Sequence, residues 1–139
     1  SMGAGMTLVL CRLLQSRTLL STSTENRGGI NLGNPLGTRQ QCPFGDYPHI
    51  QFRFACMFSS FIARDPLLQQ WLTDAPTLDV PSFHCYGLGD EIVSPDRSAA
   101  AVALFQDPVI MTHGGGHLLP SAGPVRKALK AFLHSQQQI

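Results

Sequence analysis

The sequence is poor in charge and has no long apolar run. Of its 139 residues 14% are charged and 43% are hydrophobic, and the formal net charge is +1 at pH 7. So small an excess of charge gives no basic surface of the kind that binds nucleic acid. No apolar run approaches the roughly 20 residues of a membrane span, so we expect no membrane partner. The composition is typical of a globular protein, and the length suits one domain over residues 1–139.

The cysteines lack the CxxC spacing that is typical of zinc sites, and a disulfide framework is the less favoured interpretation. There are four, scattered without CxxC spacing, at Cys11, Cys42, Cys56 and Cys85. Three of them lie in apolar segments, which is typical of reduced and buried thiols. The apolar N-terminal stretch lacks a basic region before it, so we expect no signal peptide. These features predict a cytoplasmic protein.

Short apolar stretches alternate with helical patterns along the chain. Three stretches are expected to be buried strands: residues 52–58, 80–86 and 108–112. Helices are expected over residues 3–14 and from residues 65, 94 and 124, where an N-cap residue or a proline stands. Strands that alternate with helices predict parallel pairing through right-handed crossovers. The expected fold is therefore α/β, with three αβα layers and a short, mostly parallel sheet.

Residues 16–51 have a different composition from the rest of the chain. They are rich in Ser, Thr, Asn, Gly and Pro, with Gly28-Gly29 and Asn34-Pro35 among them. Such residues interrupt regular structure, and a stretch of this length is unusual inside a compact domain. We expect residues 16–51 to form an irregular insertion.

Two polar side chains follow neighbouring predicted strands, at the point where each strand ends. Asp90 stands in Gly87-Leu-Gly-Asp90 after the second strand, and His117 follows three glycines after the third. The carboxyl ends of parallel strands meet at one edge of a sheet, so the two should lie close together. A carboxylate on one imidazole nitrogen fixes the tautomer, while the other nitrogen takes a proton from a nucleophile. Three consecutive glycines also indicate a close approach of the backbone.

The nucleophile of such a pair has to stand earlier in the chain, at a strand-to-helix turn. Ser1-Met2-Gly3-Ala4 matches the second half of a G-x-S-x-G nucleophile elbow. The order Ser, Asp, His is that of the α/β-hydrolases. A terminal Ser-Met pair is also what cleavage of an affinity tag leaves, so both origins of Ser1 stay open.

Four segments together resemble the FSH-type serine hydrolase family, the α/β-hydrolases related to the ovarian-cancer-associated serine hydrolase. They are Ser1-Met-Gly-Ala, Phe54-Ala with Ser59-Ser-Phe61, Pro81-Ser-Phe-His-Cys-Tyr-Gly-Leu-Gly-Asp90-Glu-Ile-Val, and His113-Gly-Gly-Gly-His117-Leu-Leu-Pro120. The resemblance implies a carboxylic-ester hydrolase without a cofactor. It implies Ser1 as the nucleophile, Asp90 as the orienting acid and His117 as the base. The backbone N–H of Met2 is then one oxyanion donor.

A whole α/β-hydrolase has several strands before its nucleophile, and this sequence has none. We therefore expect the chain to be the C-terminal portion of a hydrolase, with a partial α/β-hydrolase fold. Such a truncated enzyme should be weak or inactive toward its small-molecule ester substrate. The alternative is a non-catalytic α/β remnant or interaction module. The strand at 52–58 would lack a neighbour, and its apolar edge predicts a homodimer.

Other interpretations of the same residues are less favoured. Aspartate is common in turns, so a purely structural role for Asp90 is one alternative, and Glu91 is then the alternative acid. His113 and His117 have the spacing of helical zinc ligands, but three glycines between them disfavour a helix, and no third ligand is evident. Gly87-Leu-Gly89 lacks the third glycine of a dinucleotide loop. His84 is expected in the core, and Ser59 with Ser60 is expected to cap a turn.

Overall fold

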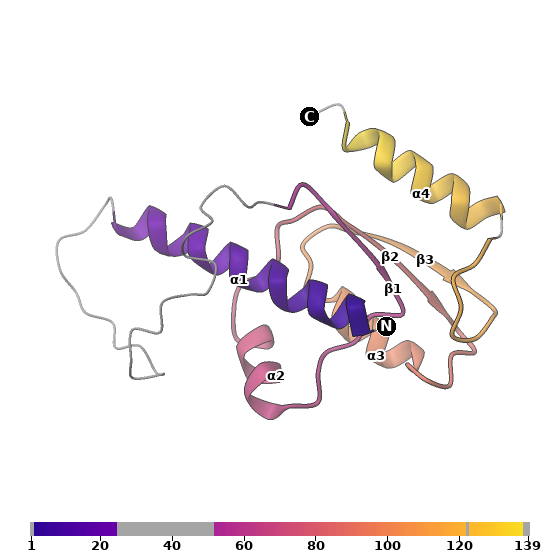
Figure 1. Ribbon diagram of the computed structural model, residues 1–139, viewed down its shortest axis with the longest axis horizontal. Helices are drawn as coiled ribbons and strands as arrows, with labels where there is room; N and C mark the ends of the chain where they lie inside the picture. The colour runs from indigo at the N-terminus through magenta and orange to yellow at the C-terminus, as the bar shows by residue number, and fades with distance from the viewer. Residues whose placement is uncertain (1, 25–51, 122, 138–139) are drawn as a thin grey trace.

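The computed structural model describes residues 2–24, 52–121 and 123–137. Within these ranges helices and strands alternate, as the sequence predicts (Figure 1). The helices are α1 (Met2–Thr24), α2 (Pro66–Thr73), α3 (Pro95–Val102) and α4 (Gly123–Ser135). The strands are β1 (Ala55–Phe58), β2 (Ser82–Gly87) and β3 (Pro108–His113).

The three strands form one parallel sheet in the order β1-β2-β3. In register, Ser82 pairs with Ala55 on one side and with Pro108 on the other, and Gly87 ends β2 opposite His113. All strands point the same way, so their carboxyl ends share one edge. In Figure 1 that edge lies toward α3 and the N-terminal end of α1.

Two apolar clusters, one on each face of the sheet, make three αβα layers. The first joins α1, α2 and α3 to the β1 side of the sheet through Leu8, Leu72, Ala101, Met57 and others. The second joins α4 to β2, and it includes Phe83, Cys85, Val125 and Phe132. Figure 1 shows α4 alone on one side, with the other three helices on the opposite side. The predicted α/β fold class is confirmed.

Two predicted helix starts differ in how they are capped. The Asp65 carboxylate accepts a hydrogen bond from the backbone N–H of Leu68 at 2.9 Å, and Pro66 opens α2. Ser94 occupies the N-cap position of α3, but its side chain makes no capping hydrogen bond. At α3 the fixed φ of Pro95 is therefore the stronger local start signal.

The strand predicted over residues 52–58 is regular only from Ala55. The backbone N–H of Ala55 donates to the carbonyl of Pro81 at 2.8 Å, and β2 begins directly after that proline. Proline has no N–H, so the ladder cannot continue beyond it. Phe52 and Phe54 consequently precede the strand and are each 38% exposed.

Helix α1 is longer than the sequence predicts. It continues to Thr24, so an irregular structure for residues 16–24 is wrong. No glycine or proline stands between Gly5 and Gly28, and nothing in that stretch forces the helix to end earlier. The remaining part of the expected insertion, residues 25–51, lies outside the described residues. Neither α1 nor another helix of the described ranges is long and apolar enough to cross a membrane.

Polar side chains of α1 tie it to the end of α2. Arg12 is buried, and its guanidinium donates to the backbone carbonyls of Pro76 and, at 2.9 Å, of Leu72. Gln15 donates to the carbonyl of Thr77 at 2.7 Å. Burial lowers the pKa of Arg12. These bonds satisfy one carbonyl in the last turn of α2 and two in the segment after it, and they join α1 to both.

Candidate active site

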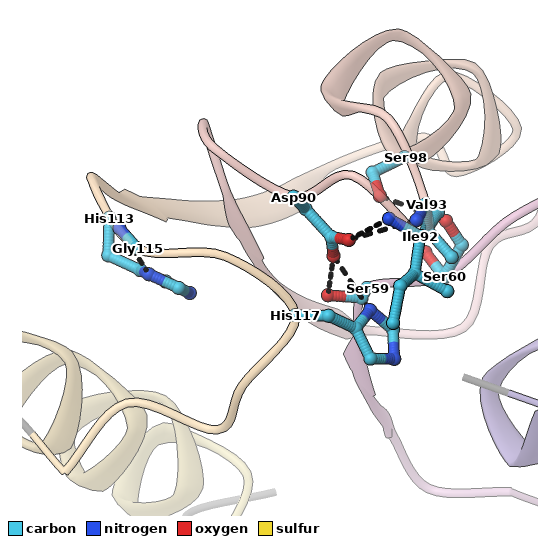
Figure 2. Close-up of polar contacts among 9 residues, drawn as sticks. All are labelled: Ser59, Ser60, Asp90, Ile92, Val93, Ser98, His113, Gly115 and His117. Carbon is cyan, nitrogen blue, oxygen red and sulfur yellow. Dashed lines mark hydrogen bonds and ion pairs between the residues drawn. The ribbon is translucent and has the colours of Figure 1, made fainter.

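Asp90 and His117 meet at the carboxyl edge of the sheet, as predicted. Asp90 lies in the turn after β2, and His117 lies in the loop after β3. The Oδ2 atom of Asp90 is 2.8 Å from Nδ1 of His117 (Figure 2). The His117 side chain is 26% exposed, whereas that of Asp90 is fully buried. The Nε2 atom of His117 has no hydrogen-bond partner among the described residues, so it is available to a reactant.

Four donors surround the Asp90 carboxylate. Oδ1 accepts from the backbone N–H groups of Ile92 and Val93, each at 2.9 Å. Oδ2 accepts from the Ser59 hydroxyl at 2.9 Å and from His117. Burial raises the pKa of Asp90, but the four hydrogen bonds outweigh it and lower this pKa from 3.8 to about 2. The carboxylate is thus ionised at neutral pH and can only accept, which places the proton of the contact on Nδ1 of His117.

Backbone hydrogen bonds join the two loops that carry this pair. The N–H of Leu88 donates to the carbonyl of His113 at 2.8 Å. The N–H of Gly89 donates to the carbonyl of Gly115 at 3.1 Å. The turn after β2 and the loop after β3 therefore hold each other, and the acid and the base are fixed by main-chain contacts.

The glycines permit this approach, and the tightest point is Gly87. A Cβ on Gly87 would stand 2.2 Å from the carbonyl oxygen of Gly115 and 2.5 Å from that of Gly116. A Cβ on Gly115 would stand 3.1 Å from the His113 ring, whereas one on Gly114 would meet nothing within 4 Å. The predicted close approach of the backbone is confirmed. The position at which it leaves no room for a side chain is Gly87, at the end of β2, and not Gly114 in the glycine run.

His113 takes no part in the contact between Asp90 and His117. Its Nδ1 accepts the N–H of Gly115 at 3.2 Å, and Figure 2 shows its ring apart from the carboxylate. Its Nε2 is buried without a partner. Within the described ranges no group of three His, Cys, Asp or Glu residues is placed to hold a metal ion.

Ser59 belongs to the site, although the sequence favoured a turn cap over a pocket-lining role for it. It directly follows β1, it is 5% exposed, and its hydroxyl bonds Asp90. Its φ of 47° is left-handed, and its N–H donates to the carbonyl of Cys85 at 2.9 Å. One signal was present in the sequence: Ser59 directly follows the strand next to the one that precedes Asp90.

The start of α1 lies toward the same edge. A Cβ on Gly5 would meet the Phe61 ring at 3.6 Å, and Phe61 is close along the chain to Ser59. Figure 1 shows the N-terminal end of α1 beside α3. Met2 is the first helical residue and is 84% exposed. Ser1, the predicted nucleophile, lies outside the described residues.

Other predicted roles can be compared with the structure. Glu91, the alternative acid, is exposed and makes no hydrogen bond with His117. His84 is a core residue, as expected: it is 1% exposed and stacks edge-on against Phe105 at 4.8 Å. Burial lowers the pKa of His84 to about 4, so it is uncharged at neutral pH.

The fold and the site together define a class of protein. A buried carboxylate that orients an imidazole, on loops after successive parallel strands, is the acid–base arrangement of an α/β-hydrolase. The model of the family described as serine hydrolase (FSH1) matches residues 1–129. The chain belongs to this family, and the resemblance seen in its motifs is confirmed.

Curated relatives carry esterase names. Esterase OVCA2 of Bos taurus is 35% identical over 81 residues, which cover 58% of this chain and 35% of that protein. Esterase OVCA2 of Homo sapiens is 32% identical with the same coverage. Esterase AAEL000016 of Aedes aegypti is 38% identical over 61 residues, 44% of this chain and 22% of that protein. The chain thus matches about a third or less of these relatives' length. No solved structure matches it.

Proposed function

We propose that the protein hydrolyses carboxylic esters by acyl transfer through Ser1, Asp90 and His117. The observation that carries the proposal is the 2.8 Å contact between Asp90 and Nδ1 of His117, which leaves Nε2 for proton transfer. Membership of a serine hydrolase family and the esterase names of the relatives support the same reaction class. The substrate is a small-molecule ester.

In the proposed reaction the serine oxygen forms a bond to the ester carbonyl carbon. His117 Nε2 removes the hydroxyl proton of Ser1 as that bond forms, and then gives it to the departing alkoxide as the ester C–O bond breaks. Water next attacks the acyl group on Ser1, with His117 again taking and returning one proton. The carboxylic acid leaves, Ser1 regains its hydroxyl, and these steps need no cofactor.

Asp90 and Met2 supply the electrostatic part of the mechanism. Asp90 remains ionised, so it stabilises the imidazolium and keeps His117 in the tautomer that accepts at Nε2. Met2 begins α1, and N–H groups in the first turn of a helix have no acceptor within the helix. We assign the N–H of Met2 to the oxyanion; one such donor contributes about 10²- to 10³-fold in rate.

A fluorophosphonate probe is expected to label Ser1, and p-nitrophenyl acetate is expected to be hydrolysed. His117→Ala should lower both rates by about 10³-fold or more, because the serine then has no proton acceptor. Mass spectrometry of the labelled peptide identifies the serine. His134→Ala is the matched control: His134 is exposed on α4, and its loss should change neither rate.

Labelling of a different serine, or turnover that survives His117→Ala, would overturn the assignment. Silence of this chain with activity in an N-terminally extended one would support truncation, whereas silence in both would favour the alternative, an α/β module that keeps the scaffold without the chemistry. We expect slow turnover from this chain, because Met2 is the one oxyanion donor assigned within the described residues.

We also propose that the chain forms a homodimer through the outer edge of β1. This strand ends the strand order, so no described strand pairs with its second edge. An apolar strand with an unpaired edge is a template for another copy. Sedimentation analysis should give twice the monomer mass, and a monomer at every concentration tested would contradict the proposal.

A cytoplasmic location is the third part of the proposal. Cys11, Cys56 and Cys85 are free thiols, which suits a reducing compartment. Burial raises the pKa of Cys11 to about 11, so this thiol is protonated and unreactive at neutral pH.

A further inference from the structure

We propose that Ser59 is a positioning residue for the acid of this site. Its hydroxyl donates to Oδ2 of Asp90 at 2.9 Å, and that oxygen is the one bonded to His117. In the proposed function its role is to keep this oxygen in the place from which it orients the imidazole. The kinetic consequence rests on the proposed function, whereas the contact with the carboxylate does not.

The arrangement of donors gives Ser59 a distinct task. The N–H groups of Ile92 and Val93 already hold Oδ1, and they belong to the same turn as Asp90. Oδ2 has no such local donor, and Ser59 comes from a different strand. The hydroxyl therefore adds a restraint at Oδ2 against rotation of the carboxylate about the Cβ–Cγ bond of Asp90. Without Ser59, His117 would be the one donor left on Oδ2 among the described residues.

The backbone of Ser59 points to the same role. Ser59 is the one non-glycine residue with a positive φ among the described residues, at 47°. Glycine adopts this conformation without the steric clash of a Cβ, so a serine here is conformationally unfavourable by comparison. The N–H bond to the Cys85 carbonyl holds the strained turn and aims the side chain at Asp90. Backbone strain is often found at functional sites, and the strained Ser59 lies at this candidate site, which supports a role for its side chain there.

Three variants separate this role from simple packing. Ser59→Ala removes the hydroxyl and keeps the strain, whereas Ser59→Gly removes both. Ser98→Ala is the matched control: Ser98 lies in α3, is fully buried, and donates to the carbonyl of Ser60, the residue after Ser59, at 3.0 Å, without a bond to Asp90.

We expect kcat for p-nitrophenyl acetate to fall about tenfold in both Ser59 variants with little change in KM, the effect of one lost hydrogen bond to a charged group. Ser59→Gly should resist denaturant better than Ser59→Ala and yet be equally slow. Ser98→Ala should lose stability and keep kcat. If kcat instead follows stability across the three variants, Ser59 is a packing residue and the proposal fails.

A second measurement needs no turnover. The carboxyl carbon of Asp90, followed by ¹³C NMR, should titrate at higher pH in both Ser59 variants than in the wild type and in Ser98→Ala, because one donor to the ionised form is lost. An unchanged titration in the Ser59 variants would overturn the proposal. Absence of both probe labelling and turnover in the wild type, with the shifted titration present, would refute the esterase assignment alone.

Discussion

Asp90→Asn is expected to reduce ester turnover by about four orders of magnitude while the chain still folds. The amide oxygen can replace Oδ1 and keep the two backbone bonds from Ile92 and Val93. The amide NH₂ group then faces Nδ1 of His117, and a donor there requires that nitrogen to accept. The imidazole proton moves to Nε2, which can no longer take a proton from the nucleophile. The measurement is kcat/KM for p-nitrophenyl acetate.

The control for this variant is Asp107→Asn, an exposed aspartate that should leave turnover unchanged. Acid unfolding offers a second check. The pKa of Asp90 is lowered to about 2 in the folded state, so its ionised form stabilises the fold above pH 3.8, and this contribution is lost as pH falls toward 2. Asp90→Asn should lack this part of the pH dependence. Full turnover in Asp90→Asn would remove Asp90 from the mechanism.

Gly87→Ala is expected to destabilise the fold by about 3 kcal/mol or more and to abolish the contact between the acid and the base. The added Cβ would stand 2.2 Å and 2.5 Å from two carbonyl oxygens of the β3 loop. These are backbone atoms that cannot rotate away, so the loops must separate. Chemical denaturation measures the loss of stability. Turnover should fall by at least about 100-fold, because small displacements of reacting groups are costly.

Gly114→Ala is the matched control for that loop. A Cβ at Gly114 would meet nothing within 4 Å, so its stability should stay within about 0.5 kcal/mol of the wild type. Equal stability of Gly87→Ala and Gly114→Ala would show that the loops are not held as closely as described.

Local patterns were sufficient to predict the order of helices and strands and the pairing of Asp90 with His117. Asp65-Pro66 starts a helix because the cap and the fixed φ act within one turn. In α4 the apolar spacing places Val125 and Phe132 on the buried face. Asp90 and His117 could be paired from sequence because each follows a parallel strand, and parallel strands end at one edge.

The rest depended on contacts between distant residues. Ser59 and Asp90, which it bonds, are 31 residues apart in the sequence. The left-handed backbone of Ser59 also has no sequence signature, because glycine is the usual residue in that conformation. The importance of Gly87 follows from carbonyls of another loop. The length of α1 was underestimated because Ser and Thr favour turns only weakly, and no stronger breaker follows until Gly28.

The mutual hydrogen bonds of the two loops limit how such a protein can diverge. Leu88 donates to the carbonyl of His113 at the end of β3, and Gly89 donates to that of Gly115 in the loop after it, so the two segments share one register. An inserted or deleted residue in either loop would shift these bonds and carry Asp90 or His117 out of reach of its partner. The lengths of both loops are therefore coupled, and a viable change in one requires a compensating change in the other.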